Sequence, residues 1–389
     1  MKNDSASLKA FLYERKKQYL YRSVKISESA QHPLMKIDGK ACLNFCSNDY
    51  LGLANHPEIV DAFKKAADKY GVSSGAAHLI NGHSIEHHKL EEALAEFTGR
   101  DKAILFSNGY MANLGVLSAL LERGDYLYQD RLNHASLIDA GLLSKSKMKR
   151  YRHNDIADLN RLYAKQESTS RNSMIVTDGV FSMDGDEALV NELATIAKQQ
   201  QAWLMVDDAH GFGVLGERGA GLLAQQKLNQ SEVPILMATL GKACGTSGAF
   251  VAGSEDLVEY LTQTARTFIY TTAMPPSIAA ATLISLKLIA KENWRREQLA
   301  NLIQRFKLGA EQLGIELMES DTAIQPIMIG STEKAVAISQ ALQEKNILVT
   351  AIRPPTVPDY TARLRVTFST NHTPEQVDTL LEALGKVMD

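Results

Sequence analysis

The chain has 389 residues, which exceeds the size that a single hydrophobic core usually supports, so we expect it to divide into subdomains. Hydrophobic residues make up 45% and charged residues 22%, as in ordinary soluble globular proteins, and the net charge of −3 offers no electrostatic basis for binding nucleic acid or an acidic membrane. The three cysteines include no CxxC pair, no run of about 18 apolar residues occurs, and the N-terminus lacks the apolar core of a signal peptide. We therefore expect a cytoplasmic protein with no membrane span, no disulfide framework and no metal site.

The first elements of the chain are predicted to be a helix and a hairpin. Residues 5–22 predict an amphipathic helix, because Leu8, Phe11 and Leu12 recur near helical spacing. The segment "LMKIDGKACLNFC" then places two short apolar runs around Asp38-Gly39, a pair of residues that favours a tight turn.

From about residue 56, helical patterns alternate with short apolar runs. The strand-like runs are "KAILF", "DYLYQ", "SMIVTDG", "AWLMVDD" and "PILMATL", and helical patterns such as "MANLGVLSALLE" lie between them. Short strands that are apolar almost throughout are typical of a mainly parallel sheet covered by helices on both faces. This part of the chain therefore predicts the α/β class.

The C-terminal part has a different pattern. After Pro275-Pro276 the sequence is helical to about residue 313, and the remainder alternates the strand-like runs "QPIMIG", "ILVTAI" and "ARLRVTF" with two helices. This remainder predicts a small α+β domain. We expect three segments: an N-terminal helix and hairpin (1–52), a large domain (53–280) and a small C-terminal domain (281–389).

Unusual residues follow several of the predicted strands, where ligands bind in open α/β sheets. Lys242 comes after "PILMATL", between two glycines, and Asp207 ends "AWLMVDD", where an acid is poorly placed unless it meets a cation. Ser107, Asn108 and Gly109 open a helix whose free N–H groups favour a phosphate. Taken singly, each feature also fits a structural role, such as a snorkelling lysine or a helix cap.

Two other interpretations compete for the same region. The segment "GFGVLG" (211–216) has the spacing of a dinucleotide fingerprint, but it does not follow its strand directly and the next residues continue as a loop. Asp207, Asp208 and His210 are suitable ligands for the metal of a hydrolase, although no further cluster at ligand spacing accompanies them.

Pyridoxal 5′-phosphate (PLP) accounts for more of these residues than either alternative. This cofactor needs a lysine to attach to, an acid against its ring nitrogen and a cradle for its phosphate. Lys242, Asp207, and the amides near Gly109 together with Thr239 supply these three elements. The protonated ring nitrogen would also serve as the counter-ion of a buried Asp207.

Longer motifs support this interpretation. The segments "FCSNDYLGL", "NHASLIDA", "TDGVFSMDGD", "VDDAHGFGVLG", "TLGKACGTSGAF" and "YTTAMPPS" closely resemble the α-oxoamine synthases, a family of fold-type I PLP enzymes, and the resemblance extends from about Leu12 to the last helix. It implies a sheet of the seven-stranded type. Within the family, "VTAIRPPTVPDYTARLRVTF" is most similar to the members that condense L-alanine with a pimeloyl thioester.

The resemblance implies a role for each matched residue. Lys242 would attach the cofactor and act as the catalytic base, Asp207 would pair with the ring nitrogen, and the catalytic His134 would stack on the ring. His210, also catalytic, and Ser182 would reach the ring hydroxyl. The phosphate ligands would be Gly109, Tyr110, Thr239 and, because the family's active sites lie at a homodimer interface, Thr271 and Thr272 of the partner subunit.

The resemblance also implies a set of substrate contacts: His134, Arg22, Asn48, Arg353, Thr356 and Arg365. A forked arginine side chain suits a carboxylate, so Arg365 would hold the amino acid. The chain departs from the family pattern at Asp178, where a glutamate is usual, and in the "SSGAA" loop at 73–77 near the acyl-donor site. The donor could be carried by coenzyme A or by an acyl carrier protein. A sister enzyme that uses glycine and acetyl-CoA, or a non-catalytic binding protein, remains an alternative.

Overall fold

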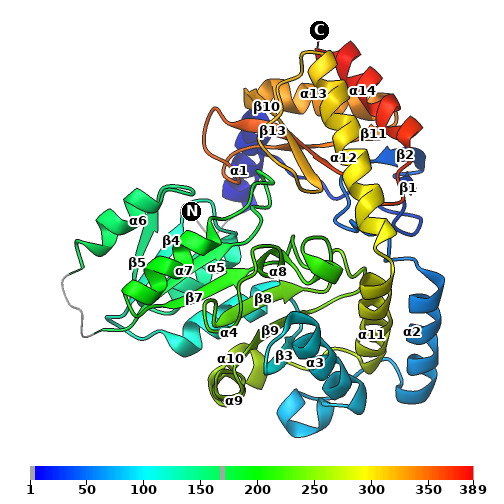
Figure 1. The fold of residues 1–389 in the computed structure, drawn as a ribbon. Coiled ribbons are helices and arrows are strands. Elements are labelled where there is room, and N and C mark those ends of the chain that lie inside the picture. Colours follow the sequence, from blue (N-terminus) through cyan, green and yellow to red (C-terminus); the bar gives the residue numbers. More distant parts are fainter. Residues whose placement is uncertain (1–4, 167–170, 389) are drawn as a thin grey trace. The chain divides into compact units, whose positions relative to one another are not determined.

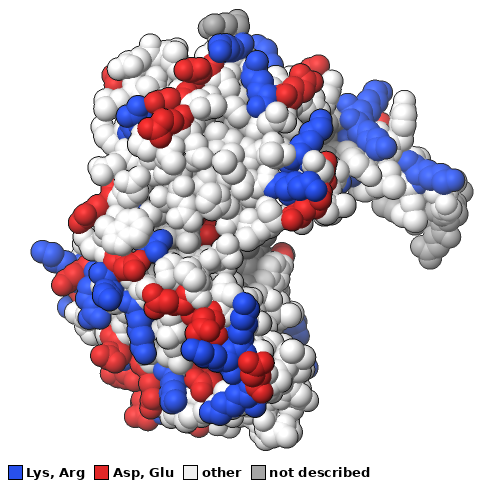
Figure 2. Space-filling model, turned by 90° about the vertical axis from the view of Figure 1, so that its right-hand side faces the viewer, with Lys and Arg blue, Asp and Glu red and all other residues white. Residues whose placement is uncertain are grey.

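The computed structural model describes residues 5–166 and 171–388, and these residues form two compact units. The smaller unit comprises Met1–Asn48, Met183–Gly185 and Gln298–Asp389, and the larger comprises Asp49–Ser182 and Asp186–Glu297. Within the described ranges, every helix is too short or too polar to cross a membrane. On the face shown in Figure 2, basic and acidic side chains are interspersed, as the small net charge leads one to expect.

The larger unit is built on a seven-stranded sheet (Figure 1). The strands lie in the order β3-β9-β8-β7-β6-β4-β5. Six of them run in the same direction, and β9 runs in the opposite direction. Their bounds are Lys102–Phe106 (β3), Tyr126–Asp130 (β4), Lys147–Tyr151 (β5), Ser173–Asp178 (β6), Trp203–Asp207 (β7), Ile235–Thr239 (β8) and Ala249–Gly253 (β9). The predicted α/β class with a mainly parallel sheet is confirmed.

Helices cover both faces of this sheet because its strands are apolar on both sides. Met174, Val176 and Met205 pack on one face with α4 (Gly109–Leu120), whereas Ile175 and Leu204 pack on the other with α7 (Val190–Gln199). The remaining helices of the unit are α2 (Pro57–Tyr70), η1 (His78–Gly82), α3 (Ile85–Thr98), α5 (Ala135–Leu143), α6 (Ile156–Tyr163), η2 (Glu217–Gly219), α8 (Leu222–Gln225), α9 (Glu255–Thr264), α10 (Arg266–Ile269) and α11 (Pro276–Lys291).

The smaller unit contains two three-stranded sheets, ordered β1-β2-β11 and β10-β13-β12. Asp38 and Gly39 have positive φ values of 48° and 79°, which is the backbone of the predicted tight turn between β1 and β2. The elements are α1 (Ser5–Lys17), β1 (Leu34–Ile37), β2 (Lys40–Asn44), α12 (Trp294–Gln312, which begins in the larger unit), β10 (Ile324–Gly330), α13 (Thr332–Glu344), β11 (Ile347–Leu348), β12 (Thr350–Ile352), β13 (Ala362–Thr367) and α14 (Pro374–Met388).

The structure differs from the predicted elements in several places. The first helix ends at Lys17 rather than at residue 22, and the helical region from 276 to 313 is two helices, separated at Glu292 and Asn293. β5 and β9 were not predicted, because β5 is a basic edge strand and β9 consists mostly of small residues. β11 pairs with β2, so N- and C-terminal segments share one compact unit. The predicted division into three segments at 52/53 and 280/281 stays a prediction.

Candidate active site

A pocket of about 180 Å³ opens at the carboxyl ends of the parallel strands in the larger unit. The segments that follow β4, β6, β7 and β8 and the first turns of α4 and α5 contribute its walls. The structure brings together eight residues that the sequence predicted for the cofactor: Gly109, Tyr110, His134, Ser182, Asp207, His210, Thr239 and Lys242.

Lys242 lies in the bend that follows β8 and belongs to a chain of polar contacts. Its Nζ is 2.9 Å from Nε2 of His210, and Nδ1 of the same imidazole is 2.7 Å from the hydroxyl of Tyr50. Tyr50 is only 1% exposed, so its hydroxyl is held in place by packing. If the hydroxyl donates to Nδ1, the Nε2–H is left to donate to the lysine nitrogen, so the orientation of the imidazole fixes the position of that nitrogen.

Asp207 is a buried carboxylate that faces the pocket. It is the last residue of β7 and is 5% exposed. Its Oδ2 accepts a hydrogen bond from Nδ2 of Asn113 at 2.8 Å, and its Oδ1 accepts one from the backbone N–H of Ala209 at 3.1 Å. Both donors are neutral, and a carboxylate can accept about four hydrogen bonds, so Asp207 retains capacity for a cationic group in the pocket.

His134 is held by two neighbouring groups at the start of α5. Its backbone N–H donates to Oδ2 of Asp178 at 3.0 Å, and its Nδ1 lies 2.8 Å from Oγ of Ser136. Asn113 donates to this Oγ as well as to Asp207, so the ring is connected to the buried carboxylate. Partial burial lowers the pKa of His134, and the charge of Asp207 opposes this. The imidazole is therefore neutral at neutral pH and can lie against an aromatic ring.

The first turn of α4 and the end of β8 form a small polar surface. The Asn108 side chain accepts the N–H of Met111, and helix geometry leaves the earlier N–H groups of Gly109 and Tyr110 for another acceptor. A Cβ added at Gly109 would lie 3.6 Å from Met237 and 4.0 Å from Thr239, so packing does not require glycine there. This glycine instead leaves space above a helix N-terminus, as a phosphate needs.

The remaining predicted site residues do not line this pocket. Thr271 is half-buried and Thr272 is exposed, and the carbonyl of Thr272 accepts a hydrogen bond from the Ser107 hydroxyl at 3.4 Å. The five predicted substrate contacts apart from His134 belong to the smaller unit: Arg22, Asn48, Arg353, Thr356 and Arg365.

Within the smaller unit, these five residues lie partly together. The two terminal nitrogens of Arg365, which is 8% exposed, are 3.4 and 3.3 Å from Oδ1 of Asn48. Nη2 of Arg22 is 3.5 Å from Oγ1 of Thr356. Arg353 donates to the backbone carbonyls at 19 and 21, which is a structural contact, and its role toward substrate stays a prediction.

Several residues that line the pocket were not predicted as site residues: Asn113, Ser136, Asp178, Val180, Ala209 and Met237. Asn113 carried a usable signal, because it is a polar residue within the apolar helix "GYMANLGVLSAL" and is 1% exposed. Burial raises the pKa of Asp178 well above its usual value, and the nearby Asp207 raises it further. Burial therefore favours the protonated form of the Asp178 carboxyl.

The two competing interpretations do not match the geometry. The segment 211–216 forms turns rather than the start of a helix, so it is not a dinucleotide fingerprint. Its first glycine packs on Asp208, whose carboxylate accepts the N–H of Leu222 at 2.8 Å and does not line the pocket. Asp207 and Asp208 thus have different surroundings and do not form a pair of metal ligands.

The fold and the pocket together define a class of protein, and comparison with known proteins agrees. The chain belongs to the aminotransferase class I and II family, whose model matches residues 40–384. It is 56% identical over 379 residues to the 8-amino-7-oxononanoate synthase of Pseudomonas entomophila (strain L48), covering 97% of this chain and 96% of that protein. The 8-amino-7-oxononanoate synthase of Thioalkalivibrio sulfidiphilus (strain HL-EbGR7) is also 56% identical, over 381 residues, with 98% and 97% covered.

Solved structures of similar proteins have the same fold. A structure of serine palmitoyltransferase (SPT) with PLP has a TM-score of 0.93 and 30% identity, covering 99% of this chain and 98% of that chain. The 8-amino-7-oxononanoate synthase of Francisella tularensis has a TM-score of 0.78 and 34% identity, covering 89% and 97%. These relatives confirm the resemblance to α-oxoamine synthases, the fold-type I architecture and PLP as the cofactor.

The residues of the pocket fit PLP. A lysine amine, a buried carboxylate with free acceptor capacity and a helix N-terminus with its first two N–H groups left for another acceptor surround one space. These are the three kinds of group that the cofactor requires.

Proposed function

We propose that this chain condenses L-alanine with a pimeloyl thioester, with loss of CO2 and free thiol, to give 8-amino-7-oxononanoate for biotin biosynthesis. The observation that carries the proposal is the 56% identity to 8-amino-7-oxononanoate synthases over nearly the whole chain. The pocket supports it, because Lys242, Asp207 and His134 lie together there.

PLP, when bound, supplies an electron sink for the negative charge that develops on the α-carbon of the amino acid. The residues of the chain hold the cofactor and move the proton. Lys242 would anchor it and then take the α-proton on Nζ, and His210 and Tyr50 hold this nitrogen in place. Asp207 would keep a positive charge on the ring nitrogen, because its carboxylate is buried and retains acceptor capacity.

The other predicted residues bind and orient. His134 would lie over the ring and Ser182 would reach the ring hydroxyl, whereas Gly109, Tyr110 and Thr239 would hold the phosphate, and all five residues line the pocket. Arg365 grips the carboxylate of alanine with its fork, and Asn48, which already contacts that guanidinium, keeps the fork in one orientation. Arg22, Arg353 and Thr356 are assigned to the substrate side.

We further propose that the functional unit is a homodimer in which Thr271 and Thr272 reach the phosphate of the partner subunit. Thr272 is exposed and does not line the pocket of its own subunit, which agrees with such a role. We place the protein in the cytoplasm because Cys42, Cys46 and Cys244 are all free thiols.

The test is product identification by mass spectrometry. The holoenzyme is offered alanine, glycine and serine, each with pimeloyl and acetyl thioesters of coenzyme A and of an acyl carrier protein. We expect alanine with a pimeloyl thioester to give the highest kcat/KM, and the two carriers will show which thioester is used. A preference of about tenfold or more for glycine with acetyl-CoA, or roughly 1.4 kcal/mol in transition-state binding, would make the chain a 2-amino-3-ketobutyrate CoA ligase instead. A protein that binds PLP but forms no product would be a binding protein.

A further inference from the structure

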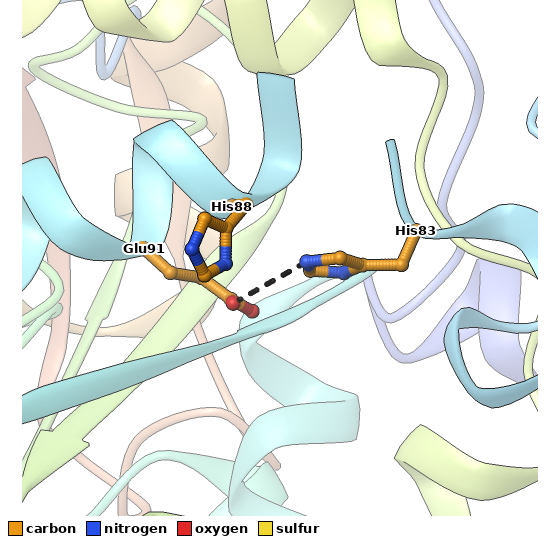
Figure 3. Close-up of side chains that lie close together, drawn as sticks. All are labelled: His83, His88 and Glu91. Atoms are coloured by element: carbon orange, nitrogen blue, oxygen red, sulfur yellow. Dashed lines mark ion pairs between the residues drawn. The ribbon is translucent and has the colours of Figure 1, made fainter. Parts of the chain in front are cut away.

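Outside the pocket, the larger unit carries a cluster of histidines around the start of α3. His83 lies in the segment between η1 and α3, and His88 and Glu91 lie on α3 itself. His88 and Glu91 are three residues apart on the helix, so their side chains project from the same side. Figure 3 shows the ring of His83 pointing at the carboxylate of Glu91, with the ring of His88 beside that carboxylate.

The distances within this cluster are those of a loosely assembled ligand set. Nε2 of His83 is 3.8 Å from Oε2 of Glu91, and one ligand atom from each of the three residues lies within 4.8 Å of the others. In a tetrahedral zinc site with bonds of about 2.1 Å, two ligand atoms are roughly 3.4 Å apart. His83 and Glu91 are therefore near their bound separation, and only His88 has to turn.

The exposure and contacts of the three side chains agree with a movement of His88 alone. The side chain of Glu91 is 17% exposed and that of His83 is 29% exposed, so their surroundings restrict both. Oε1 of Glu91 accepts the backbone N–H of Leu105 at 3.1 Å, which ties the carboxylate to β3. The side chain of His88 is 58% exposed, lies 3.4 Å from the exposed Glu92 and meets the ring of His83 edge-on at 6.1 Å between centroids, so its rotation costs little.

Hydrogen bonds orient His83 for binding. Its Nδ1 is 2.8 Å from Nδ1 of His78, whose ring is stacked on Phe268 with centroids 4.9 Å apart. When His83 donates its Nδ1–H to His78, the lone pair of Nε2 points toward Glu91. An imidazole fixed through one nitrogen and free at the other is the usual arrangement of a histidine metal ligand.

His87, the remaining histidine of this region, is fully used by the fold. Its Nδ1 accepts the N–H of Ser84 at 2.9 Å, and its Nε2–H donates to the carbonyl of Met274 at 2.7 Å. His87 thus fixes the first turn of α3, and both of its ring nitrogens are already engaged.

We propose that His83, His88 and Glu91 bind one divalent transition-metal cation, for which Zn²⁺ is the best fit. Two imidazoles and one carboxylate form a ligand set that suits zinc, and a water completes the coordination. His83 and Glu91 also line a cavity of about 380 Å³, which gives the ion a way in. The bound ion joins the segment before α3 to the helix and, through Glu91, to β3, so it stabilises this corner of the larger unit.

The experiment is a titration of the PLP-loaded enzyme with zinc chloride in a calorimeter at neutral pH, after removal of metals with a chelator. We expect one site per chain with a Kd on the order of micromolar. His88→Ala should weaken binding by about tenfold or more, and Glu91→Gln should do the same while keeping an oxygen for the Leu105 N–H. His32→Ala, which removes an exposed histidine of the smaller unit, is the matched control and should bind as the wild type does.

A spectroscopic readout identifies the ligands independently. Cobalt(II) in the same site should show the intense d–d absorption of four-coordinate N/O ligation, and His88→Ala should lose it. The cofactor absorbance should stay unchanged in both proteins. If zinc binds His88→Ala and Glu91→Gln as tightly as the wild type, or if binding changes the cofactor absorbance, the metal is held elsewhere and the proposal is wrong. The absence of saturable binding to the wild type would also overturn it.

Discussion

Asp207 and Asp208 are adjacent acids with different surroundings, and this difference can be tested. Asp207→Asn should keep the hydrogen bond from Asn113 or from Ala209 but lose the negative charge. We expect the exchange of the α-proton of alanine, followed by NMR in deuterium oxide, to fall by about 100-fold or more, because the charge acts in the transition state.

The control is Asp208→Asn. Burial raises the pKa of Asp208 to about 8, so a neutral amide resembles the acid that is mostly present at neutral pH. The exchange rate of this variant should stay within a few fold of the wild type. Equal losses in the two variants would contradict the assignment of Asp207 to the ring nitrogen.

His153 supplies a second prediction at the scale of single residues, concerning stability. Its two ring nitrogens lie 3.0 Å from Asp130 and 2.8 Å from Asp186. Burial by itself lowers the pKa of this histidine, but the hydrogen bonds to the two carboxylates outweigh it and raise the pKa to about 10. The folded pKa is thus above the unfolded value of about 6.5.

A raised pKa gives a defined pH dependence. The stabilisation from His153 is fully present below about pH 6.5 and is lost as the pH rises toward 10. His153→Gln should lower the free energy of unfolding by roughly 3 kcal/mol at pH 6, as expected for a broken buried ion pair, and by much less near pH 10. Urea denaturation at several pH values measures this. A difference between the two proteins that is independent of pH would show that the ring is not charged in the folded state.

At the scale of elements, two glycine-to-alanine substitutions separate the effect of close packing on stability from the effect of helix propensity. A Cβ at Gly211, in the turn after β7, would lie 2.1 Å from Oδ1 of Asp208, so Gly211→Ala should cost about 1–3 kcal/mol of stability. Gly385, inside α14, has only ordinary contacts with Leu313 at 3.5 Å, so Gly385→Ala should add about 0.5–1 kcal/mol through helix propensity. Chemical denaturation measures both. Changes of the same sign would contradict this account.

At the scale of the whole molecule, the proposed homodimer predicts complementation between two inactive variants. Lys242→Ala removes the anchor of its own pocket, and the double variant Thr271→Ala/Thr272→Ala damages the phosphate site of the partner. In a mixed dimer, one site carries both lesions and the other carries none. Activity should therefore return when the two proteins exchange subunits, up to about a quarter of the wild-type value, because half of the dimers are mixed and half of their sites are intact.

The controls for this experiment are each variant incubated alone, which should stay inactive, and light scattering at the assay concentration. A monomer with full activity would contradict the proposal, as would subunit exchange without any recovery.

The strand pattern by itself predicted part of the active-site pocket, because ligands bind at the strand ends of a parallel sheet, and the family resemblance supplied Tyr110, His134, Ser182 and His210. Lys242, Asp207 and Gly109 each follow or end an apolar strand, and the carboxyl ends of parallel strands meet at one edge. Their neighbourhood therefore followed from the strand pattern without knowledge of the packing. The same local reasoning predicted the turn at Asp38-Gly39, since the backbone there is set by the two residues themselves.

Only the tertiary structure decided which side chains meet across elements. Asn113 reaches Asp207 and Tyr50 reaches His210 from segments far away in sequence, and no local pattern encodes those contacts. The role of Asp208 is also a tertiary result, because its carboxylate accepts the N–H of Leu222, fourteen residues further along the chain. The pairing of β2 with β11 likewise joins an N-terminal and a C-terminal segment. The edge of a strand has N–H and C=O groups that need partners, and the fold decides which strand supplies them.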